Sequence, residues 1–414
     1  MSVMKTNANG AEVVVTGMGM IGAAGVGVEA GWRRVLAGAP TAAPLAALAG
    51  CPVDFGCEVP GFDAPTALGA RRASGTERFT QLALVACAEA LRSACLEPTG
   101  RNPARTGVVL GTAAGGTAAL EAGQAALVTG GPAAVPGRTM PAGLLSAAAG
   151  ELSVEFGVRG VALTVTTACA SGSMAIGVAR DLIRSGTADV VLAGGTDAPL
   201  TPLNAAAYHR LRALSRRVED PAGACRPFSA SRDGFVIGEG AGVLVLESAA
   251  HARRRGAPVV ARLSGYGTSA DAHHATRPPA DGAGARQAME AALRDAGVAA
   301  SAVGYVNAHG TSTVRNDLAE GAAIRAVLGG AVPVSSTKGV TGHTFGAAGA
   351  IEAILTILAL RDGLLPATAN LTDPDPLIEL DLIAKEARAC SAGAALSNSF
   401  GFGGYNASLL FTRP

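Results

Sequence analysis

Charge is scarce in this sequence, and lysine is scarcer still. Only 16% of the 414 residues are charged, the formal net charge is +1, and three residues are lysines. There is no basic arm or tail, so nucleic acid is not expected as a partner. The apolar runs are too short to cross a bilayer, because Ile351–Leu360 is interrupted by Glu352. Residues 1–10 lack the apolar segment of a signal peptide, so we expect a cytoplasmic protein with no membrane partner.

Paired cysteines are missing as well. The seven cysteines are irregularly spaced and include no C-x-x-C pair, so neither a disulfide framework nor a metal site is predicted. The segment Gly17–Gly22 matches the glycine pattern of a dinucleotide site. However, the acidic residue expected about 20 residues later, at the end of a second strand, is missing. We therefore expect no bound cofactor and attribute these glycines to tight α/β turns.

Hydrophobic residues are plentiful, at 49% of the chain, which is enough for a large buried core. Short β-rich runs such as Val13–Thr16 and Asp189–Ala193 alternate with helical stretches such as Ala348–Leu360. This alternation predicts an α/β fold with a largely parallel sheet. No Pro- or Ser-rich linker divides the chain, and the weakest seam is at His251–Pro258, where an arginine run precedes a new strand.

One cysteine differs from the others in its surroundings. Cys169 lies in the segment A-L-T-V-T-T-A-C-A-S-G, between a β-rich run and a helical run that begins at Ser173. A cysteine at a helix N-terminus gains thiolate stabilisation from the helix dipole and from free amide donors. A single cysteine is more often a small buried hydrophobe. The small neighbours of Cys169 leave room for a substrate, and this context indicates a nucleophile.

Two of the six histidines lie in glycine-bounded segments that follow β-rich runs. His309 is in Y-V-N-A-H-G-T-S-T, and His343 is in S-S-T-K-G-V-T-G-H. Either one alone is compatible with a hydrogen-bonded core histidine. Together with a cysteine they suit a two-step task, in which the thiolate takes an acyl group and neutral imidazoles stabilise the enolate of a second thioester. We expect Lys338 and Glu352 to form an ion pair that fixes this geometry.

Four motifs in sequence order carry a resemblance to a known family. T-A-C-A-S-G, N-A-H-G-T-S-T, S-S-T-K-G-V-T-G-H and N-S-F-G-F-G-G-Y-N resemble those of the elongating β-ketoacyl-acyl carrier protein synthases. The resemblance runs from Val14 to Phe411 and implies a thiolase fold of the α/β class. In that fold two pseudo-equivalent halves form a five-layered αβαβα sandwich, usually in a dimer. The halves are expected at residues 1–255, with the cysteine, and 256–414, with both histidines.

The resemblance implies a role for each matching residue. Cys169 matches the acylated nucleophile, and His309 and His343 match the decarboxylation pair. Lys338 and Glu352 match the supporting ion pair. Asp317 and Glu320 match two further acidic positions of the family, near the histidines.

A glycine-flanked aromatic residue matches the gate of the family. Phe402, between Gly401 and Gly403, matches a mobile lid that opens when the cysteine is acylated, and flanking glycines suit a hinge. The backbone amides of Cys169 and Phe402 match the oxyanion hole. Substrates of the family arrive on the phosphopantetheine of an acyl carrier protein, so no separate cofactor is implied.

Pocket and docking residues are also suggested by the resemblance. Ala114 stands where fatty-acid enzymes often have a bulkier residue in the acyl pocket, so a longer or stiffer chain is expected to fit. Tyr405 replaces the threonine usual in the last motif and, with Phe400, is expected to shape the pocket or the gate. The candidates for docking an acidic carrier protein are Arg212, Arg71 and Arg72. Arg212 alone matches a family docking position, and ordinary solvation explains these arginines equally well.

The sequence thus indicates a decarboxylating condensing enzyme of a dissociated, type II system, which extends an acyl group with malonyl-acyl carrier protein. Ala114 and Tyr405 favour a polyketide product, and a housekeeping fatty-acid synthase is the alternative. The chain is expected to form a homodimer, or a heterodimer with a catalytically inactive chain-length-factor homologue. A non-catalytic chain-length partner is a further alternative, which the retained Cys169 disfavours. A degradative thiolase would need a second cysteine near Gly401–Gly404, and the sequence has none there.

Overall fold

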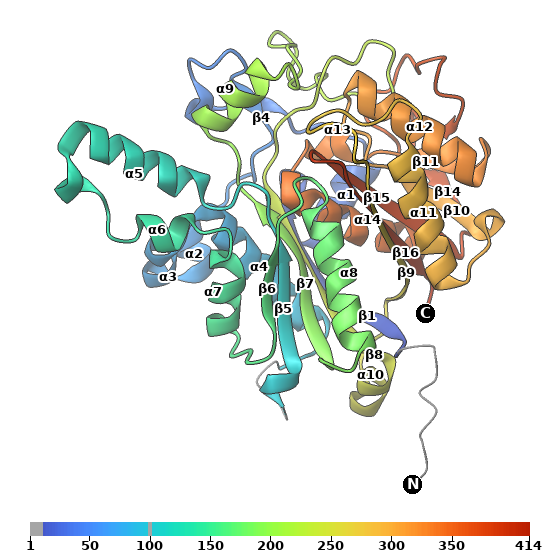
Figure 1. The fold of residues 1–414 in the computed structure, drawn as a ribbon, viewed down its shortest axis with the longest axis horizontal. Coiled ribbons are helices and arrows are strands. Elements are labelled where there is room, and N and C mark those ends of the chain that lie inside the picture. The colour runs from blue at the N-terminus through green and yellow to red at the C-terminus, as the bar shows by residue number, and fades with distance from the viewer. Residues whose placement is uncertain (1–10, 98–101) are drawn as a thin grey trace.

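Strands and helices alternate in two successive rounds along the chain. The computed structural model describes residues 11–97 and 102–414 (Figure 1). In the first round the strands lie side by side in the order β6-β5-β7-β8-β1. Their bounds are β1 Val13–Gly22, β5 Thr106–Gly111, β6 Ala162–Val165, β7 Val190–Asp197 and β8 Gly240–Ser248.

The second round repeats this topology. Its strands follow the order β11-β10-β15-β16-β9, with β13 added outside β11. In each round three parallel strands are followed by two antiparallel ones. The bounds are β9 Ala261–Ala270, β10 Val303–Asn307, β11 Pro333–Ser335, β13 Asp381–Leu382, β15 Ala394–Gly401 and β16 Tyr405–Thr412. This duplication confirms the predicted thiolase fold.

The two sheets meet at a narrow joint. Strands β1 and β9 pair over two residue pairs only, Val14 with Arg262 and Val15 with Ala261. The domain boundary between residues 255 and 256 stays a prediction, because the sheet continues across this joint. The short strand β2, Gly25–Val26, pairs with β1. Four other short strands form two small sheets, β3 Ala43–Pro44 with β4 Phe55–Gly56, and β12 Leu364–Leu365 with β14 Arg388–Ala389.

Helices form three layers around the two sheets. Helices α4 and α7 cover the outer face of the first sheet, α11 and α12 cover the outer face of the second, and α8 and α14 lie between the sheets. The bounds are α4 Arg78–Ser93, α7 Ala147–Glu155, α8 Ser171–Arg184, α11 Ala283–Ala296, α12 Val314–Leu328 and α14 Ala348–Asp362. The remaining helices are α1 Val28–Leu36, α2 Ala64–Leu68, α3 Ala70–Gly75, α5 Thr117–Gly130, α6 Thr139–Gly143, α9 Pro202–Arg210, α10 Ala249–Arg255 and α13 Lys338–Thr341.

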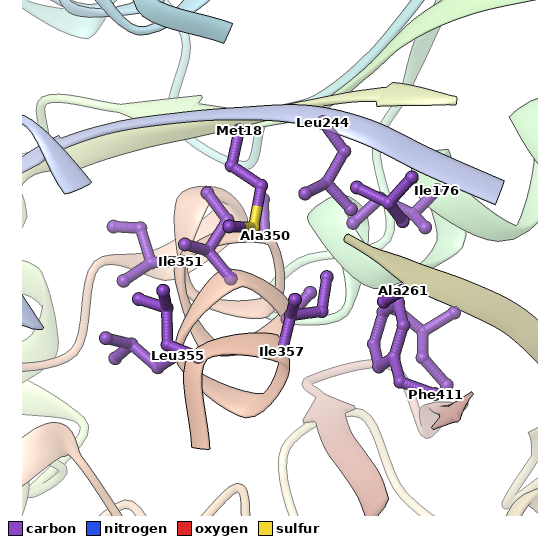
Figure 2. Close-up of a cluster of buried hydrophobic side chains, with 14 of the residues drawn as sticks. Met18, Ile176, Leu244, Ala261, Ala350, Ile351, Leu355, Ile357 and Phe411 are labelled. Carbon is purple, nitrogen blue, oxygen red and sulfur yellow. The ribbon is translucent and has the colours of Figure 1, made fainter. Parts of the chain in front are cut away.

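The middle layer is where the core is deepest. Residues 348–360 of α14 are all buried, which explains why this helix is apolar around its whole circumference rather than on one stripe. Figure 2 shows its side chains between Met18 and Leu244 of the first sheet and Phe411 of the second. The two central helices therefore begin at buried places between the sheets, where their N-terminal turns are shielded from water.

The glycines of the segment Gly17–Gly22 have a packing role. They lie inside β1 and not in a turn, so the attribution to a tight turn is wrong. Helix α4 crosses this strand so closely that a Cβ on Gly17 would lie 2.2 Å from the carbonyl oxygen of Ala90, and one on Gly19 would lie 1.9 Å from that of Ala86. The pattern therefore marks a close approach of helix and strand.

One part of the fold stands away from the layers. Helices α5 and α6 project from the first half as an arm (Figure 1). Within residues 11–97 and 102–414, no helix is both long and apolar enough to cross a membrane.

Candidate active site

The predicted nucleophile lies in a tight turn between β6 and α8. Cys169 comes two residues before Ser171, the first residue of α8, as the sequence predicts. The Ser171 hydroxyl accepts a hydrogen bond from the N–H of Thr167 at 2.8 Å and donates to the carbonyl of Ala168 at 2.6 Å. Ala168 has φ of +50°, a left-handed conformation that is uncommon for a residue with a Cβ. These bonds hold a strained turn that presents the sulfur.

Burial dominates the chemistry of this thiol. Only 8% of Cys169 is exposed, and burial raises the pKa of its thiol to about 12. The Lys338 ammonium and the backbone N–H groups of Phe402 and of Cys169 itself oppose this shift. The expected stabilisation of the thiolate at a helix N-terminus is therefore outweighed, and the resting side chain is a thiol. The two N–H groups that face the sulfur are those predicted for the oxyanion hole.

His343 lies directly beside the sulfur. It follows α13 in a loop whose backbone bonds to the 236–238 segment, and its Nε2 lies 3.0 Å from Sγ of Cys169. The imidazole stacks on Phe345, with ring centroids 5.2 Å apart and an interplanar angle of 5°. Burial, and then the charge of Lys338, hold the pKa of His343 well below its usual range. This ring is neutral at physiological pH.

His309 follows β10 and faces the same point. Glu320 accepts hydrogen bonds from the backbone N–H groups of His309 and Gly310, both at 2.7 Å. Lys338 Nζ donates to the carbonyl of His309 at 2.5 Å and lies 3.3 Å from its Nδ1. An ammonium can only donate, so Nδ1 accepts and the ring proton is on Nε2. Burial, Lys338 and His343 all hold the pKa of His309 well below its usual range.

The expected ion pair is formed beneath the two histidines. Lys338 Nζ donates to Oε1 of Glu352, and both side chains are almost fully buried. Burial raises the pKa of Glu352 to about 7, although the Lys338 ammonium opposes this. Burial likewise raises the pKa of Glu320 to about 7. Asp317, the other matched acidic position, accepts from the N–H of Phe228 at 2.9 Å and supports the loop rather than the histidines directly.

A cavity of about 910 Å³ leads from the surface to these side chains. Cys169, His309 and His343 lie at its inner end, and Phe400 and Phe402 line it. A Cβ on Gly401 would lie 2.7 Å from the carbonyl oxygen of Thr167, so only glycine allows the gate segment to approach the nucleophile turn.

The gate segment is held by a neighbouring loop. The N–H of Gly403 donates to the carbonyl of Ala275 at 2.7 Å, and the N–H of Asp271 donates to that of Gly404 at 2.9 Å. Gly403 and Gly404 have φ of +88° and +77°, as a hinge of glycines permits.

The predicted pocket residues occupy different places. Phe400 lies with its ring centroid 5.9 Å from that of His309, and Tyr405 is 41% exposed at the cavity. Both line it, and so does Ala113. Ala114 is the next residue, and its N–H donates to Asp197 at 2.9 Å. Its place in the acyl pocket stays a prediction.

Arginine dominates the cavity mouth. Arg212 lies there, as the docking hypothesis requires, together with Arg210, Arg277 and Arg315. Over residues 11–97 and 102–414, none of these four forms an ion pair. Sequence reasoning missed the last three, because they lie in three separate segments with no motif of their own.

The other two docking candidates are on α3, away from the lining of this cavity. Arg71 is exposed there. Arg72 is half-buried and forms an ion pair with Glu155 of α7. Their part in docking stays a prediction.

The three donor atoms at the inner end also have the spacing of metal ligands. The sulfur of Cys169 and one ring nitrogen each of His309 and His343 all lie within 4.8 Å of one another. The Lys338 ammonium next to His309 opposes a second cation at this place. A buried thiol between two neutral imidazoles instead suits acyl transfer to sulfur and stabilisation of a developing oxyanion.

Comparisons with known proteins agree with this chemistry. Two family models match the chain, the β-ketoacyl synthase N-terminal domain over residues 11–252 and the C-terminal domain over residues 260–372. The 3-oxoacyl-[acyl-carrier-protein] synthase 2 of Vibrio harveyi is 43% identical, over 97% of this chain and 98% of the relative.

Solved ketosynthases have the same fold. The ishigamide ketosynthase/chain length factor has a TM-score of 0.91 and 34% identity, covering 98% of this chain and 100% of the other. The same values apply to a type II PKS ketosynthase bound to the hexaketide and in complex with its acyl-carrier protein.

Proposed function

This chain belongs to the β-ketoacyl synthase family, and from that premise we propose that it extends an acyl chain by decarboxylative condensation with malonyl-acyl carrier protein. The observation that carries the proposal is the meeting of Cys169, His309 and His343 at the inner end of one cavity. A chain-length partner without catalysis would not need this arrangement. We also propose a cytoplasmic site of action.

Acyl transfer comes first. The sulfur of Cys169 attacks the thioester carbonyl of the incoming acyl-carrier protein, and the backbone N–H groups of Cys169 and Phe402 donate to the oxyanion. The new C–S bond to Cys169 replaces the bond to the carrier thiol. The departing carrier sulfur takes up the proton lost by the Cys169 thiol, and the N–H at Nε2 of His343, 3.0 Å from Sγ, donates to the transient thiolate.

Decarboxylation follows on the malonyl thioester. The bond to the carboxylate carbon breaks, CO₂ leaves, and the electron pair moves into an enolate. The neutral imidazoles of His309 and His343 donate from Nε2 to the enolate oxygen, and Lys338 keeps the proton of His309 on that nitrogen.

Carbon–carbon bond formation completes the cycle. The enolate carbon attacks the acyl carbonyl on Cys169, which forms the new C–C bond and breaks the C–S bond. The sulfur leaves as a thiolate and takes up one proton, which its raised pKa favours. The β-ketoacyl product remains on the carrier protein.

We propose a polyketide chain as the preferred substrate, and a fatty acyl chain as the second candidate. Small residues at Ala113 and Ala114 and the exposed ring of Tyr405 support an elongated or stiff acyl group. The identity to 3-oxoacyl-[acyl-carrier-protein] synthase 2 supports the fatty acyl candidate.

The mouth of the cavity is the proposed docking place for the acyl carrier protein. Four arginines surround the opening, and an acidic partner would be attracted to them. The phosphopantetheine arm would then follow the cavity to Cys169. Arg315→Glu with Arg277→Glu should raise the KM for the carrier-bound substrate and leave hydrolysis of a small thioester unchanged.

A homologous chain is the proposed second subunit, either a copy of this chain or a chain-length-factor homologue. The arm, helix α7 and the edge strand β6 expose large apolar side chains, as surfaces that bind another protein do. These are Leu120, Leu127, Val128, Met140, Leu144, Leu145, Val154 and Leu163. Sedimentation velocity should give a dimer, and a monomer both alone and with the homologue would contradict the proposal.

Intact-protein mass spectrometry tests the proposed function. The protein would be incubated with acyl-carrier proteins that bear saturated, polyunsaturated or β-ketoacyl chains, with and without a partner subunit. An acyl adduct on the wild type and none on Cys169→Ala is expected, and the preferred chain distinguishes polyketide from fatty acid. No adduct under any condition would favour the chain-length partner.

A further inference from the structure

A single buried carboxylate joins two loops that border the cavity. Asp197 is the last residue of β7 and is fully buried. Its two oxygens accept five hydrogen bonds, and Asp197 forms no ion pair with any residue of 11–97 or 102–414. The donors are the hydroxyl of Thr112 at 2.6 Å and the backbone N–H groups of Ala113, Ala114, Gly115 and Gly346 at 2.8, 2.9, 3.1 and 2.6 Å.

One of the two loops places the ring on which His343 stacks. Phe345 lines the cavity and has φ of +51°, a conformation that persists only where neighbouring contacts hold it. The next residue, Gly346, donates to Asp197, and a Cβ there would lie 2.6 Å from the carboxylate. The strained turn under His343 is therefore fastened by this carboxylate.

The other loop leads to the nucleophile. Ala113 lines the cavity, and the carbonyl oxygen of Thr112 lies 3.3 Å from the hydroxyl oxygen of Ser171. Ser171 is the residue that shapes the turn of Cys169. Asp197 thus lies between the two turns that bring the sulfur and the imidazole to 3.0 Å of each other.

We propose that Asp197 is a positioning residue, which clamps the 112–115 loop to the Phe345–Gly346 turn and thereby holds His343 against Cys169. The inference rests on the function proposed for these two side chains. Asp197 does not line the cavity, so it acts through its neighbours and touches no substrate.

The donors around Asp197 make the charge-neutral isostere a sharp probe. One carboxylate oxygen faces two backbone N–H groups, and the other faces two backbone N–H groups and a hydroxyl. An asparagine amide must turn its NH₂ towards one of these sides. In either orientation the NH₂ faces at least two backbone N–H groups, and these can only donate, so their hydrogen bonds are lost. Asp197→Asn therefore loosens one loop without changing the volume of the side chain.

The experiment measures condensation per active site, counted by alkylation of Cys169 with iodoacetamide. We expect Asp197→Asn to lower kcat per titrated site by about 10- to 100-fold with KM for malonyl-acyl carrier protein nearly unchanged. Thr112→Val removes one donor of five and should lower kcat by about threefold. Should Asp197→Asn fail to fold, Thr112→Val alone decides, and an unchanged kcat in that variant overturns the proposal.

A matched control separates positioning from stability. Glu247 is another fully buried carboxylate, paired with Val190 at the far end of β7, about 23 Å along the strand from Asp197. Glu247→Gln should lower the melting temperature and leave kcat per titrated site unchanged. If Asp197→Asn behaves in the same way, Asp197 is merely structural and the proposal is overturned.

A second readout follows the cysteine itself. Nε2 of His343 lies 3.0 Å from Sγ of Cys169, so loosening of the clamp in Asp197→Asn should change the rate at which Cys169 is alkylated, whereas Glu247→Gln should leave this rate unchanged. Equal alkylation rates in Asp197→Asn and the wild type would contradict the proposal. If His343→Ala leaves condensation unchanged, the proposed function fails. If that variant is impaired while Asp197→Asn is normal, only the positioning role fails.

Discussion

The two halves of the molecule share one topology and supply different chemistry. In the first half the turn between β6 and α8 carries Cys169. In the second half the equivalent connection, between β11 and α14, carries His343. The loop after β5 begins with Thr112 and small residues, whereas the equivalent loop after β10 carries His309. The first half thus contributes a sulfur and space, and the second contributes the imidazoles and the buried ion pair.

This difference indicates how the site is built. The duplicated framework brings the ends of β5, β6, β10 and β11 to one place between the sheets. It does so whichever residues follow these strands. Chemistry is then decided by single residues at equivalent positions. If this is correct, the contribution of each half can be removed separately, and the other half should continue to perform its own step.

Removal of the sulfur should have the largest effect. Cys169→Ala should abolish acyl adducts and lower condensation by at least about 10⁴-fold, because the atom that receives the acyl group is lost. Malonyl-acyl carrier protein should still lose CO₂, since both imidazoles remain. Intact-protein mass spectrometry and CO₂ release measure the two steps.

A second buried cysteine provides the control for this variant. Cys87 lies on the buried face of α4, away from the cavity, and Cys87→Ala should acylate normally. Acyl adducts on Cys169→Ala would remove the sulfur from the mechanism.

Removal of an imidazole should have the next largest effect. His343→Ala should still form an acyl adduct on Cys169, but decarboxylation should fall by about 10²- to 10³-fold, because one donor to the enolate is lost. Single-turnover acylation and CO₂ release separate the two steps. His251, which bonds to Glu247 far from the cavity, offers the control His251→Ala. Normal condensation by His343→Ala would show that the second half does not supply this step.

Removal of a charge beneath the histidines should act on stability first. Glu352→Ala removes both the counter-ion of the buried Lys338 and the oxygen to which its ammonium donates, and should lower the free energy of unfolding by about 3–5 kcal/mol. The Arg105–Asp189 pair of the first half is partly exposed, so Asp189→Asn should cost no more than about 1 kcal/mol. Urea denaturation measures both, and equal losses would contradict the contrast between the halves.

The neutral isostere Glu352→Gln tests the effect of pH on the same position. The pKa of Glu352 is raised from 4.5 to about 7 in the folded state, so the folded chain binds more protons than the unfolded chain between these values. This contribution to stability is present at low pH and is lost as pH rises through 7. Glu352→Gln should reduce the downward slope of stability against pH by at most about 1.4 kcal/mol per pH unit. If the slope of stability against pH is the same in Glu352→Gln as in the wild type, the pKa of Glu352 is not raised.

The sequence predicted the fold and the inner end of the site for physical reasons. Strand–helix alternation indicates an α/β fold, and chemically distinctive residues in glycine-rich turns at strand ends converge wherever the strands are parallel. That is why Cys169, His309 and His343 could be predicted, and why the structure places Lys338 against Glu352 as expected.

Other features depend on packing between distant segments and leave no local pattern. Asp197 is one acidic residue at a strand end, and only the fold brings it to the loop of residues 112–115 and to Gly346. The thiolate stabilisation expected for Cys169 at a helix N-terminus is outweighed, because burial raises the pKa of its thiol. The arginines at the cavity mouth come together only in the folded chain.

The smallest expected effect concerns which residue of the first half limits the acyl chain. Ala113 lines the cavity, whereas Ala114 is its neighbour, and the backbone N–H groups of both residues donate to Asp197. If Ala114 is part of the acyl pocket, Ala114→Phe should shorten the products and lower turnover by less than about tenfold, since added volume costs little where a loop can yield. Ala113→Phe is the matched variant, and mass spectrometry of the released products compares the two. Shorter products from Ala113→Phe alone would show that the wall of the pocket lies one residue earlier than the family resemblance suggests.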